Sequence, residues 1–360
     1  MTLTPERRCV IRILRSFLRV PGAEAGLPAF PSAAGWYRLL ALLRFHRLVP
    51  VACRVFSKEG LLASLPPSFG AALKEGTRES SARSLFLEAH LQTLGEAFRR
   101  RKIPFIVLKG PAIAHEYYHP SYLRPYGDLD VLIRFDDFDR AGKLLGDRGF
   151  VPEDPTKVRF TDPAVKAVPF MNALVPGLSV DLQWETVTLY WGRKPFLSAE
   201  DTWRRVHEIG NGGASFLGLD PTLLLPYLCV HLMSHHHFSP LISLVDIGLI
   251  IEEERRPVDW EAVLTLAGEQ GIGSALYYPL RFLRDPLGLA VPAPVLEALK
   301  PGVVTRGLFP AERLALRSRP LTVWAERAAK FFLIDDWEER VKALGTFYRY
   351  RVRRRPGSGT

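Results

Sequence analysis

Hydrophobic and polar positions change their spacing twice along the chain. Up to residue 101, apolar residues recur at helical spacing in three blocks, residues 5–19, 35–57 and 79–101, separated by Pro- and Gly-bearing turns. Between residues 102 and 217, short alternating runs predict strands. The expected strands lie around Phe105, Leu129, Phe170 and Asp181. Helical spacing returns over residues 218–347, and residues 348–360 form a basic tail.

These patterns predict an α/β (α+β) protein. The core is expected over residues 102–217, with a short mixed sheet, and N- and C-terminal helical regions flank it over residues 1–101 and 218–347. Asp220 and Pro221 have the residue types of a helix start, and prolines such as Pro279 are expected to break the C-terminal helices.

Two aspartates lie one residue apart at the start of an apolar strand. Successive side chains of a strand point to opposite faces, so Asp128 and Asp130 share a face while Leu129 and Val131 occupy the other. Two carboxylates about 7 Å apart at the backbone repel each other unless a cation lies between them. Oxygen ligands beside phosphates suit Mg²⁺, so the pair indicates a metal and nucleotide site.

A loop that suits phosphate precedes this pair. The buried run ending at Leu108 leads into Lys109 and Gly110, and Pro111 suits the first turn of a helix. Gly110 allows the backbone to approach a ligand closely, and backbone amides at a helix start attract phosphate. Lys109 adds a mobile positive charge.

A third acid follows on the alternating run at residues 178–185. Asp181 lies at its apolar centre, and we expect it to complete a triad with Asp128 and Asp130. Glu185 falls on the same strand face and is the alternative third ligand. Asp136 and Asp137 precede a helical pattern, which is typical of N-cap residues rather than of ligands.

These motifs resemble those of a bacterial family of uncharacterised nucleotidyltransferases within the polymerase-β-like superfamily. The family pattern runs LKG, then R-x-x-x-D-[IL]-D-[IL]-L, then an acid-bearing DLHW-like strand. Here the motifs are Leu108-Lys109-Gly110, the segment from Arg124 to Leu132, and Asp181-Leu182-Gln183-Trp184. The resemblance extends to residues 45–50 and 244–246 and to His231. The chain departs from the pattern with Val131 in place of Ile or Leu, and with Gln183 where His is common.

The resemblance implies a nucleotidyltransferase fold that moves a nucleoside monophosphate from an NTP to an acceptor hydroxyl and releases pyrophosphate. Asp128 and Asp130 would hold two Mg²⁺ ions, and Asp181 would bind the ion on the acceptor side. Lys109, Gly110 and Arg124 would contact the triphosphate. The alternatives are a catalytically silent binding or regulatory protein, against which the three acids count, and a transferase that modifies RNA.

Charge and cysteine content narrow the class of protein. A net charge of +10 suits polyanionic ligands, and arginines concentrate at both ends of the chain. Weak nucleic-acid binding is expected through the C-terminal arginines, which are Arg349, Arg351, Arg353, Arg354 and Arg355. Three cysteines spaced far apart argue against a disulfide framework. The sequence contains no apolar run long enough for a transmembrane segment, and arginines occupy the place of a signal-peptide core, so we expect a cytoplasmic protein.

Three further patterns have two readings each. His231 and His235 lie four residues apart on an expected helix, which fits either a zinc site or a helix end with satisfied histidines. The glycine-rich residues 210–213 fit a hairpin turn better than a phosphate loop, since no lysine follows. The arginine-rich first helix fits either a membrane surface or packing on the core.

Overall fold

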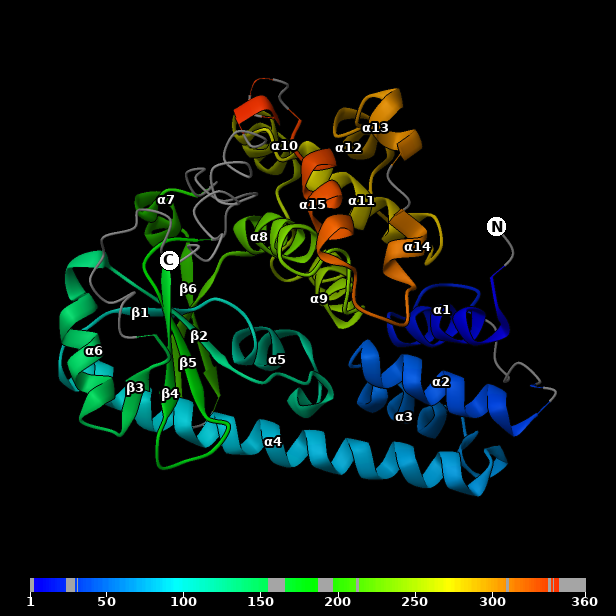
Figure 1. Ribbon diagram of the computed structural model, residues 1–360, viewed down its shortest axis with the longest axis horizontal. Helices are drawn as coiled ribbons and strands as arrows, with labels where there is room; N and C mark the ends of the chain where they lie inside the picture. The colour runs from blue at the N-terminus through cyan, green and yellow to red at the C-terminus, as the bar shows by residue number, and fades with distance from the viewer. Residues whose placement is uncertain are drawn as a thin grey trace, which may run out of the picture.

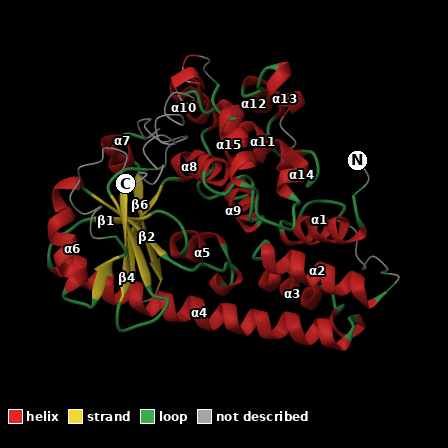
Figure 2. Cartoon of the chain, in the orientation of Figure 1, coloured by secondary structure: helices red, strands yellow, loops and turns green. Residues whose placement is uncertain are grey.

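A mixed sheet with helices on both faces forms the centre of the fold in the computed structural model, which describes residues 3–23, 30, 32–154, 166–186, 197–211, 214–308, 311–335, 338 and 340–342. Figure 2 shows the strands gathered at one end of the molecule, with helices making up the rest. Figure 1 shows α6 on one side of the sheet and α5 and α8 on the other. The expected fold class is confirmed.

Seven described strands form the sheet in the order β3-β4-β5-β2-β1-β7-β6. They are β1 (Phe105–Val107), β2 (Leu129–Ile133), β3 (Phe150–Pro152), β4 (Ala167–Asn172), β5 (Ser179–Gln183), β6 (Val206–Asn211) and β7 (Ala214–Leu219). Strand β2 lies in the middle, antiparallel to β1 and parallel to β5. The pairing of β2 with β5 places Asp130 directly beside Asp181. The strands expected around Phe105, Leu129, Phe170 and Asp181 correspond to β1, β2, β4 and β5.

Alternation along β2 divides its side chains between two apolar layers. Leu129, Val131 and Ile133 pack in a layer with residues of α4 and α6. Leu132 belongs to the larger core on the opposite face, which includes most of α8, α9 and α11. Asp130 shares the face of Leu132, because the side chains of a strand alternate with a period of two. The expected separation of the aspartates from Leu129 and Val131 is therefore confirmed.

Four helices and one short 3-10 turn form the described residues of the N-terminal part. They are α1 (Pro5–Phe17), α2 (Ala33–Phe45), α3 (Val49–Lys58), η1 (Leu62–Ser64) and α4 (Pro67–Arg100). The helical block expected over residues 35–57 contains two helices, because Arg47 adopts a left-handed backbone (φ 58°) that ends α2, and Pro50 lies in the first turn of α3. Helix α4 begins twelve residues before the expected 79, since buried Phe69 and Leu73 stabilise a segment that glycines weaken locally.

The first helix packs on the protein interior. The apolar face of α1, which carries Cys9, Val10, Ile13 and Leu14, is buried in the large core. This packing accounts for the apolar positions of the arginine-rich helix without a membrane. Cys9, Cys53 and Cys229 are free thiols. Among the described residues, no helix is both long and apolar enough to cross a membrane.

Within the part of the chain that the structure describes, five short helical segments accompany the sheet. They are α5 (Pro111–Tyr117), η2 (Ser121–Leu123), η3 (Phe135–Asp137), α6 (Phe138–Gly146) and α7 (Ala199–Arg204). Asp137 occupies the N-cap position of α6 as expected, but its carboxylate pairs with Arg140 at 2.5 Å instead of accepting from a helix amide. The expected hairpin at residues 210–213 is present, because β6 and β7 pair antiparallel up to Asn211 and Ala214, although residues 212–213 lie outside the described part.

The C-terminal part is helical. Its described helices are α8 (Pro221–Ser234), α9 (Ile242–Ile251), α10 (Trp260–Gln270), α11 (Gly273–Arg284), α12 (Ala293–Ala298), α13 (Val303–Leu308), α14 (Ala311–Ala315) and α15 (Val323–Phe332). Asp220 caps α8 as expected, with Oδ1 accepting from the Thr222 amide at 2.9 Å. The expected break at Pro279 was wrong, because this proline lies inside α11. The basic C-terminal arginines lie outside the described residues.

Candidate active site

Three aspartates converge at the middle of the sheet. Asp128 directly precedes β2, Asp130 lies on β2, and Asp181 lies beside Asp130 on β5. One carboxylate oxygen from each of the three lies within 4.8 Å of the other two. Asp130 shares the sheet face of Leu132, which packs in the core that includes α8, and the three charges add to burial in raising the pKa of Tyr227 on that helix. The parallel pairing of β2 with β5 therefore brings together the acids that the sequence placed on two separate strands.

Lys109 pairs with the most buried of the three acids. Its Nζ lies 3.0 Å from Asp130 Oδ2, and Gln183 Nε2 donates to Asp130 Oδ1 at 3.0 Å. Burial acts to lower the pKa of Lys109, but the charges of Asp130 and Asp128 outweigh it and raise that pKa. For Asp130, burial and Asp128 outweigh Lys109, so its pKa is also raised. Lys109 thus compensates only part of the negative charge of the three aspartates.

Asp181 carries the clearest sign of this uncompensated charge. Burial, together with the charges of Asp130 and Asp128, raises the pKa of Asp181 to about 6. The donor set contains only carboxylate oxygens, which is the ligand type that hard divalent cations prefer. Converging oxygens with excess negative charge therefore fit a divalent cation held by Asp128, Asp130 and Asp181.

In the metal-free protein, the stability of the fold is expected to depend on pH through Asp181. The folded state keeps this proton up to a pH of about 6, whereas an unfolded aspartate loses it near pH ~3.9, so stability should fall as pH rises between these values. Asp181→Asn should therefore raise the free energy of unfolding by about 2 kcal/mol at pH 8 and by nearly nothing below pH ~4. Urea unfolding in EDTA measures both values.

The matched control for that measurement is Asp136→Asn, at an exposed aspartate outside the triad. It should leave the pH dependence unchanged. An equal gain in the free energy of unfolding for Asp181→Asn at pH 4 and at pH 8 would contradict the assigned cause. At pH 4 the folded state already holds Asp181 protonated and neutral, so replacing it with neutral asparagine should change little.

Helix α4 anchors the two loops that lead into β2 and β5, the strands of Asp130 and Asp181. Arg83 Nη2 donates to the carbonyl of Gly127 at 2.8 Å and also to the carbonyl of Gly177, next to the starts of β2 and β5. Tyr126 donates from its hydroxyl to the Ser84 carbonyl at 3.2 Å. Arg83 therefore ties together the strand ends that set the distance between Asp128 and Asp181. The sequence contained no signal for this role, because Arg83 lies far from both strands in the chain.

Arg124 lies in a buried network with the C-terminal helices. Its Nε and Nη2 donate to Asp246 Oδ1 and Oδ2 at 2.9 and 2.7 Å, and the Tyr118 hydroxyl donates to Asp246 Oδ1 at 2.7 Å. Burial opposes the charged guanidinium, but Asp246 outweighs it and raises the pKa of Arg124. These hydrogen bonds direct Arg124 toward α9, and its contact with a triphosphate stays a prediction. The pairing links the loop before Asp128 to α9.

The Lys109-Gly110 loop approaches the aspartates closely. Gly110 has φ 60° and ψ −111°, and a Cβ atom there would lie 3.6 Å from the Asp128 carbonyl oxygen. A side chain would be strained in this conformation, so the residue suits glycine. Helix α5 behind the loop has seven residues and starts with Pro111, which lacks an amide donor.

Glu185 lies outside the triad. Its carboxylate pairs with Lys166 at 2.6 Å, on the β4 side of the sheet. The rings of His231 and His235 stack with centroids 5.1 Å apart. Among the described residues, the three aspartates are the one group of His, Cys, Asp and Glu side chains that converges as metal ligands would. Among the described residues, neither Glu185 nor the histidines belong to a converging group of this kind.

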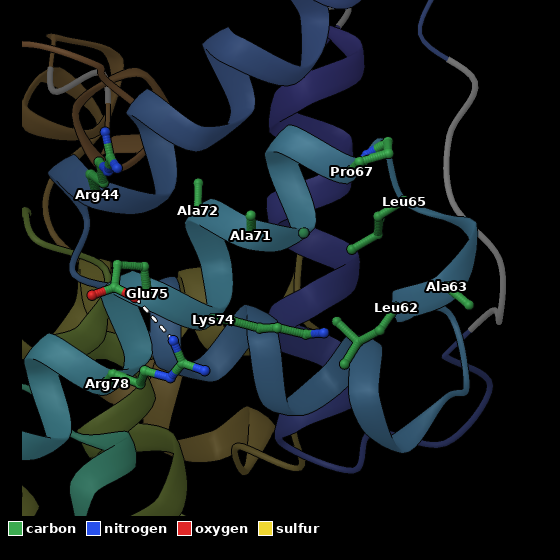
Figure 3. A pocket seen from close by; sticks show the side chains of 11 residues that line it. Arg44, Leu62, Ala63, Leu65, Pro67, Ala71, Ala72, Lys74, Glu75 and Arg78 are labelled. Atoms are coloured by element: carbon green, nitrogen blue, oxygen red, sulfur yellow. Dashed lines mark hydrogen bonds and ion pairs between the residues drawn. The ribbon is translucent and has the colours of Figure 1, made fainter.

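A groove of about 790 Å³ lies away from the aspartates, where the end of α2 approaches η1 and the start of α4. Figure 3 shows Lys74 pointing toward Leu62, and Arg78 paired with Glu75. Its charged side chains are exposed, and none of the residues that line it belongs to the triad. The groove is therefore separate from the aspartate site.

Comparison with known proteins connects this geometry to a family. A family model described as "Uncharacterised nucleotidyltransferase" matches residues 32–288. No curated protein and no solved structure matches the chain significantly. The matched segment contains Lys109, the three aspartates and Asp246, and it covers more than half of the 360 residues. The chain therefore belongs to the family of uncharacterised nucleotidyltransferases.

Proposed function

We propose that the protein transfers a nucleoside monophosphate from an NTP to an acceptor hydroxyl and releases pyrophosphate. Two Mg²⁺ ions held by Asp128, Asp130 and Asp181 would support the reaction. The observation that carries this proposal is the convergence of the three carboxylates within 4.8 Å, beside Lys109, in a chain of this family. Divalent ions at such a site would neutralise the negative charge of the NTP phosphates.

The side chains of the site have separate roles in this proposal. Lys109 attracts the triphosphate while pairing with Asp130, and Gly110 lets the backbone approach the phosphates. The acceptor oxygen bonds to the α-phosphorus as the bond from that phosphorus to the bridging oxygen breaks, so pyrophosphate leaves. Asp181 is ionised above a pH of about 6 and can accept the proton of the hydroxyl.

Arg124 has a positioning role in this scheme. Its hydrogen bonds to Asp246 hold the loop before Asp128 against α9, so the C-terminal helices support the site. We propose the same division for the protein as from the sequence, in which residues 102–217 form the core, and residues 1–101 and 218–347 form helical regions around it.

Transfer of label from an α-³²P NTP into fractionated cell extract tests the proposal. With Mg²⁺, the wild-type protein should label an acceptor and release unlabelled pyrophosphate. Asp181→Asn should slow single-turnover transfer by about 10²-fold or more while Mg·NTP affinity stays close to normal, since Asp128 and Asp130 remain to bind the nucleotide side. Calorimetry measures the affinity.

Glu185→Gln is the matched control, because Glu185 lies on the same face of the same stretch of chain but pairs with Lys166. It should transfer label at nearly the wild-type rate. Equal losses of affinity and rate in Asp181→Asn would assign Asp181 to nucleotide binding. No labelled product from any NTP in any fraction would favour a catalytically silent binding protein.

A further inference from the structure

A second cavity, smaller than the groove of Figure 3, is lined by histidines and arginines. Its volume is about 230 Å³, and three segments far apart in the chain meet around it. They are the turn after α2 with Arg47, the turn after α8 with His235, His236 and His237, and the segment before and into α15 with Arg317 and Glu326. We call this cavity the histidine–arginine pocket.

Backbone contacts hold the pocket together. Arg317 donates from Nη2 to the His236 carbonyl at 3.0 Å and from Nη1 to the His237 carbonyl. His46 Nδ1 accepts from the Leu241 amide at 3.3 Å, which joins the end of α2 to the start of α9. His237 has a left-handed backbone (φ 49°), which is costly for a residue with a side chain. The walls are therefore built by specific tertiary contacts.

The potential inside the pocket is positive. Burial, together with the charges of Lys109 and Arg47, lowers the pKa of His236 to about 4. Burial and the charges of Lys330 and Arg317 likewise lower the pKa of His237 to about 4. Both rings are therefore neutral near pH 7, and each keeps one N–H that can donate.

Glu326 is the acid of the lining. It lies 3.9 Å from His237 Nε2 and its charge acts on Arg317. Arg47 is exposed, and its guanidinium has no hydrogen-bond or ion-pair partner among the residues that the structure describes. The pocket thus has one uncompensated guanidinium beside neutral imidazoles.

Charges of the aspartate site act on the histidines in and beside the pocket. The charges of Lys109 and Asp128 both act on His236, and the ring of His231 lies 4.7 Å from that of His236. The charges of Lys109 and Arg124 act on His231 in turn. His236 therefore belongs to the pocket and also feels the charges of Lys109 and Asp128.

The arrangement favours an anion over a metal ion. The histidines of the pocket do not converge as metal ligands, since the aspartates are the one such group in the described residues. Guanidinium and imidazole N–H groups approaching from several directions suit the oxygens of a tetrahedral anion. A cavity of about 230 Å³ holds a phosphate and adjoining atoms but is too small for a nucleotide-sized ligand.

We propose that the histidine–arginine pocket binds a phosphate group of a substrate of this enzyme, with Arg47 supplying the charge and His236 lining the cavity beside it. This inference rests on the proposed function, because only that function makes the bound ligand a substrate. The phosphate belongs either to a phosphorylated small-molecule acceptor or to the NTP itself.

Titration of inorganic phosphate into the full-length protein in EDTA, followed by calorimetry, tests the pocket without any turnover. Arg47→Gln should weaken phosphate binding by about tenfold, the loss expected for one charge-assisted contact. His236→Leu should weaken it as well. The matched control is Arg54→Gln, at an exposed arginine on α3 that does not line the pocket, and it should bind phosphate as wild type does.

Equal phosphate affinity in Arg47→Gln, Arg54→Gln and wild type would overturn the proposal. Acetate that binds as tightly as phosphate and with the same dependence on Arg47 would also overturn it. These results do not depend on label transfer, so a failure of the proposed function would be seen separately in the transfer assay.

A second titration in Mg²⁺ with a non-hydrolysable α,β-methylene NTP identifies the source of the phosphate. Simultaneous binding of phosphate and the analogue, with analogue affinity unchanged in Arg47→Gln, assigns the pocket to a phosphorylated acceptor. Mutual exclusion, with analogue affinity reduced in Arg47→Gln, assigns it to the NTP. Either outcome supports a phosphate site.

Discussion

Replacing Asp130 with asparagine is expected to lower nucleotidyl transfer by about 10²- to 10³-fold, the range found when an electrostatic contact to a reacting group is removed. Asp130 is the most buried acid of the triad, and it contacts both Lys109 and Gln183. The change removes a charge from the proposed metal site and also leaves buried Lys109 without its counter-charge. Single-turnover label transfer measures the loss.

Because Asp130→Asn alters a buried ion pair, Asp128→Asn provides a variant that separates activity from folding. Asp128 is partly exposed and forms no ion pair within the described part of the chain, so this variant should fold normally and lose transfer to a similar extent. Asp136→Asn, at an exposed aspartate six residues beyond Asp130, should keep full activity. Wild-type transfer by a folded Asp128→Asn protein would exclude the proposed metal site.

Replacing Asp246 with asparagine is expected to lower the free energy of unfolding by about 3–5 kcal/mol, the cost of leaving one member of a buried ion pair uncompensated. Asp246 is fully buried and receives three hydrogen bonds, two from Arg124 and one from Tyr118. The variant leaves the Arg124 guanidinium in a low-dielectric interior without an opposite charge. Urea unfolding monitored by circular dichroism gives the free energy.

Two control variants separate the effect of burying the Asp246 charge from the effect of its ion pair with Arg124. Asp285→Asn removes a partly exposed acid that pairs with Arg281 at 3.0 Å, and it should cost less than about 1 kcal/mol. The double variant Arg124→Met with Asp246→Leu removes both buried charges and should recover most of the stability. A single Asp246→Asn variant as stable as wild type would show that the pair does not stabilise the fold.

Much of the candidate site could be predicted from local patterns. The period of two of an expected strand predicted that Asp128 and Asp130 share a face, and their carboxylates do converge, although Asp128 lies just before β2. The departure at Gln183 left the role of its side chain open, and the structure shows that it donates to Asp130. By contrast, Arg83 and Tyr227 approach the site from helices whose positions depend on contacts between distant segments.

The fold shows the same division between local and distant effects. Asp220 caps α8 through a bond to Thr222 two residues away, so its role could be predicted from neighbouring residues. The end of α2 at Arg47 and the early start of α4 were missed, since packing against other helices overrides local propensity.

By itself, the sequence determined the strand and helix types of the core, the shared face of the aspartate pair and the resemblance to the nucleotidyltransferase family. Only the tertiary structure decided that Asp181 lies beside Asp130, because this depends on the register between β2 and β5. It also decided that Arg124 pairs with Asp246, 122 residues away. Periodicity reports which face of an element is buried, whereas the partner across that face depends on how the chain folds back on itself.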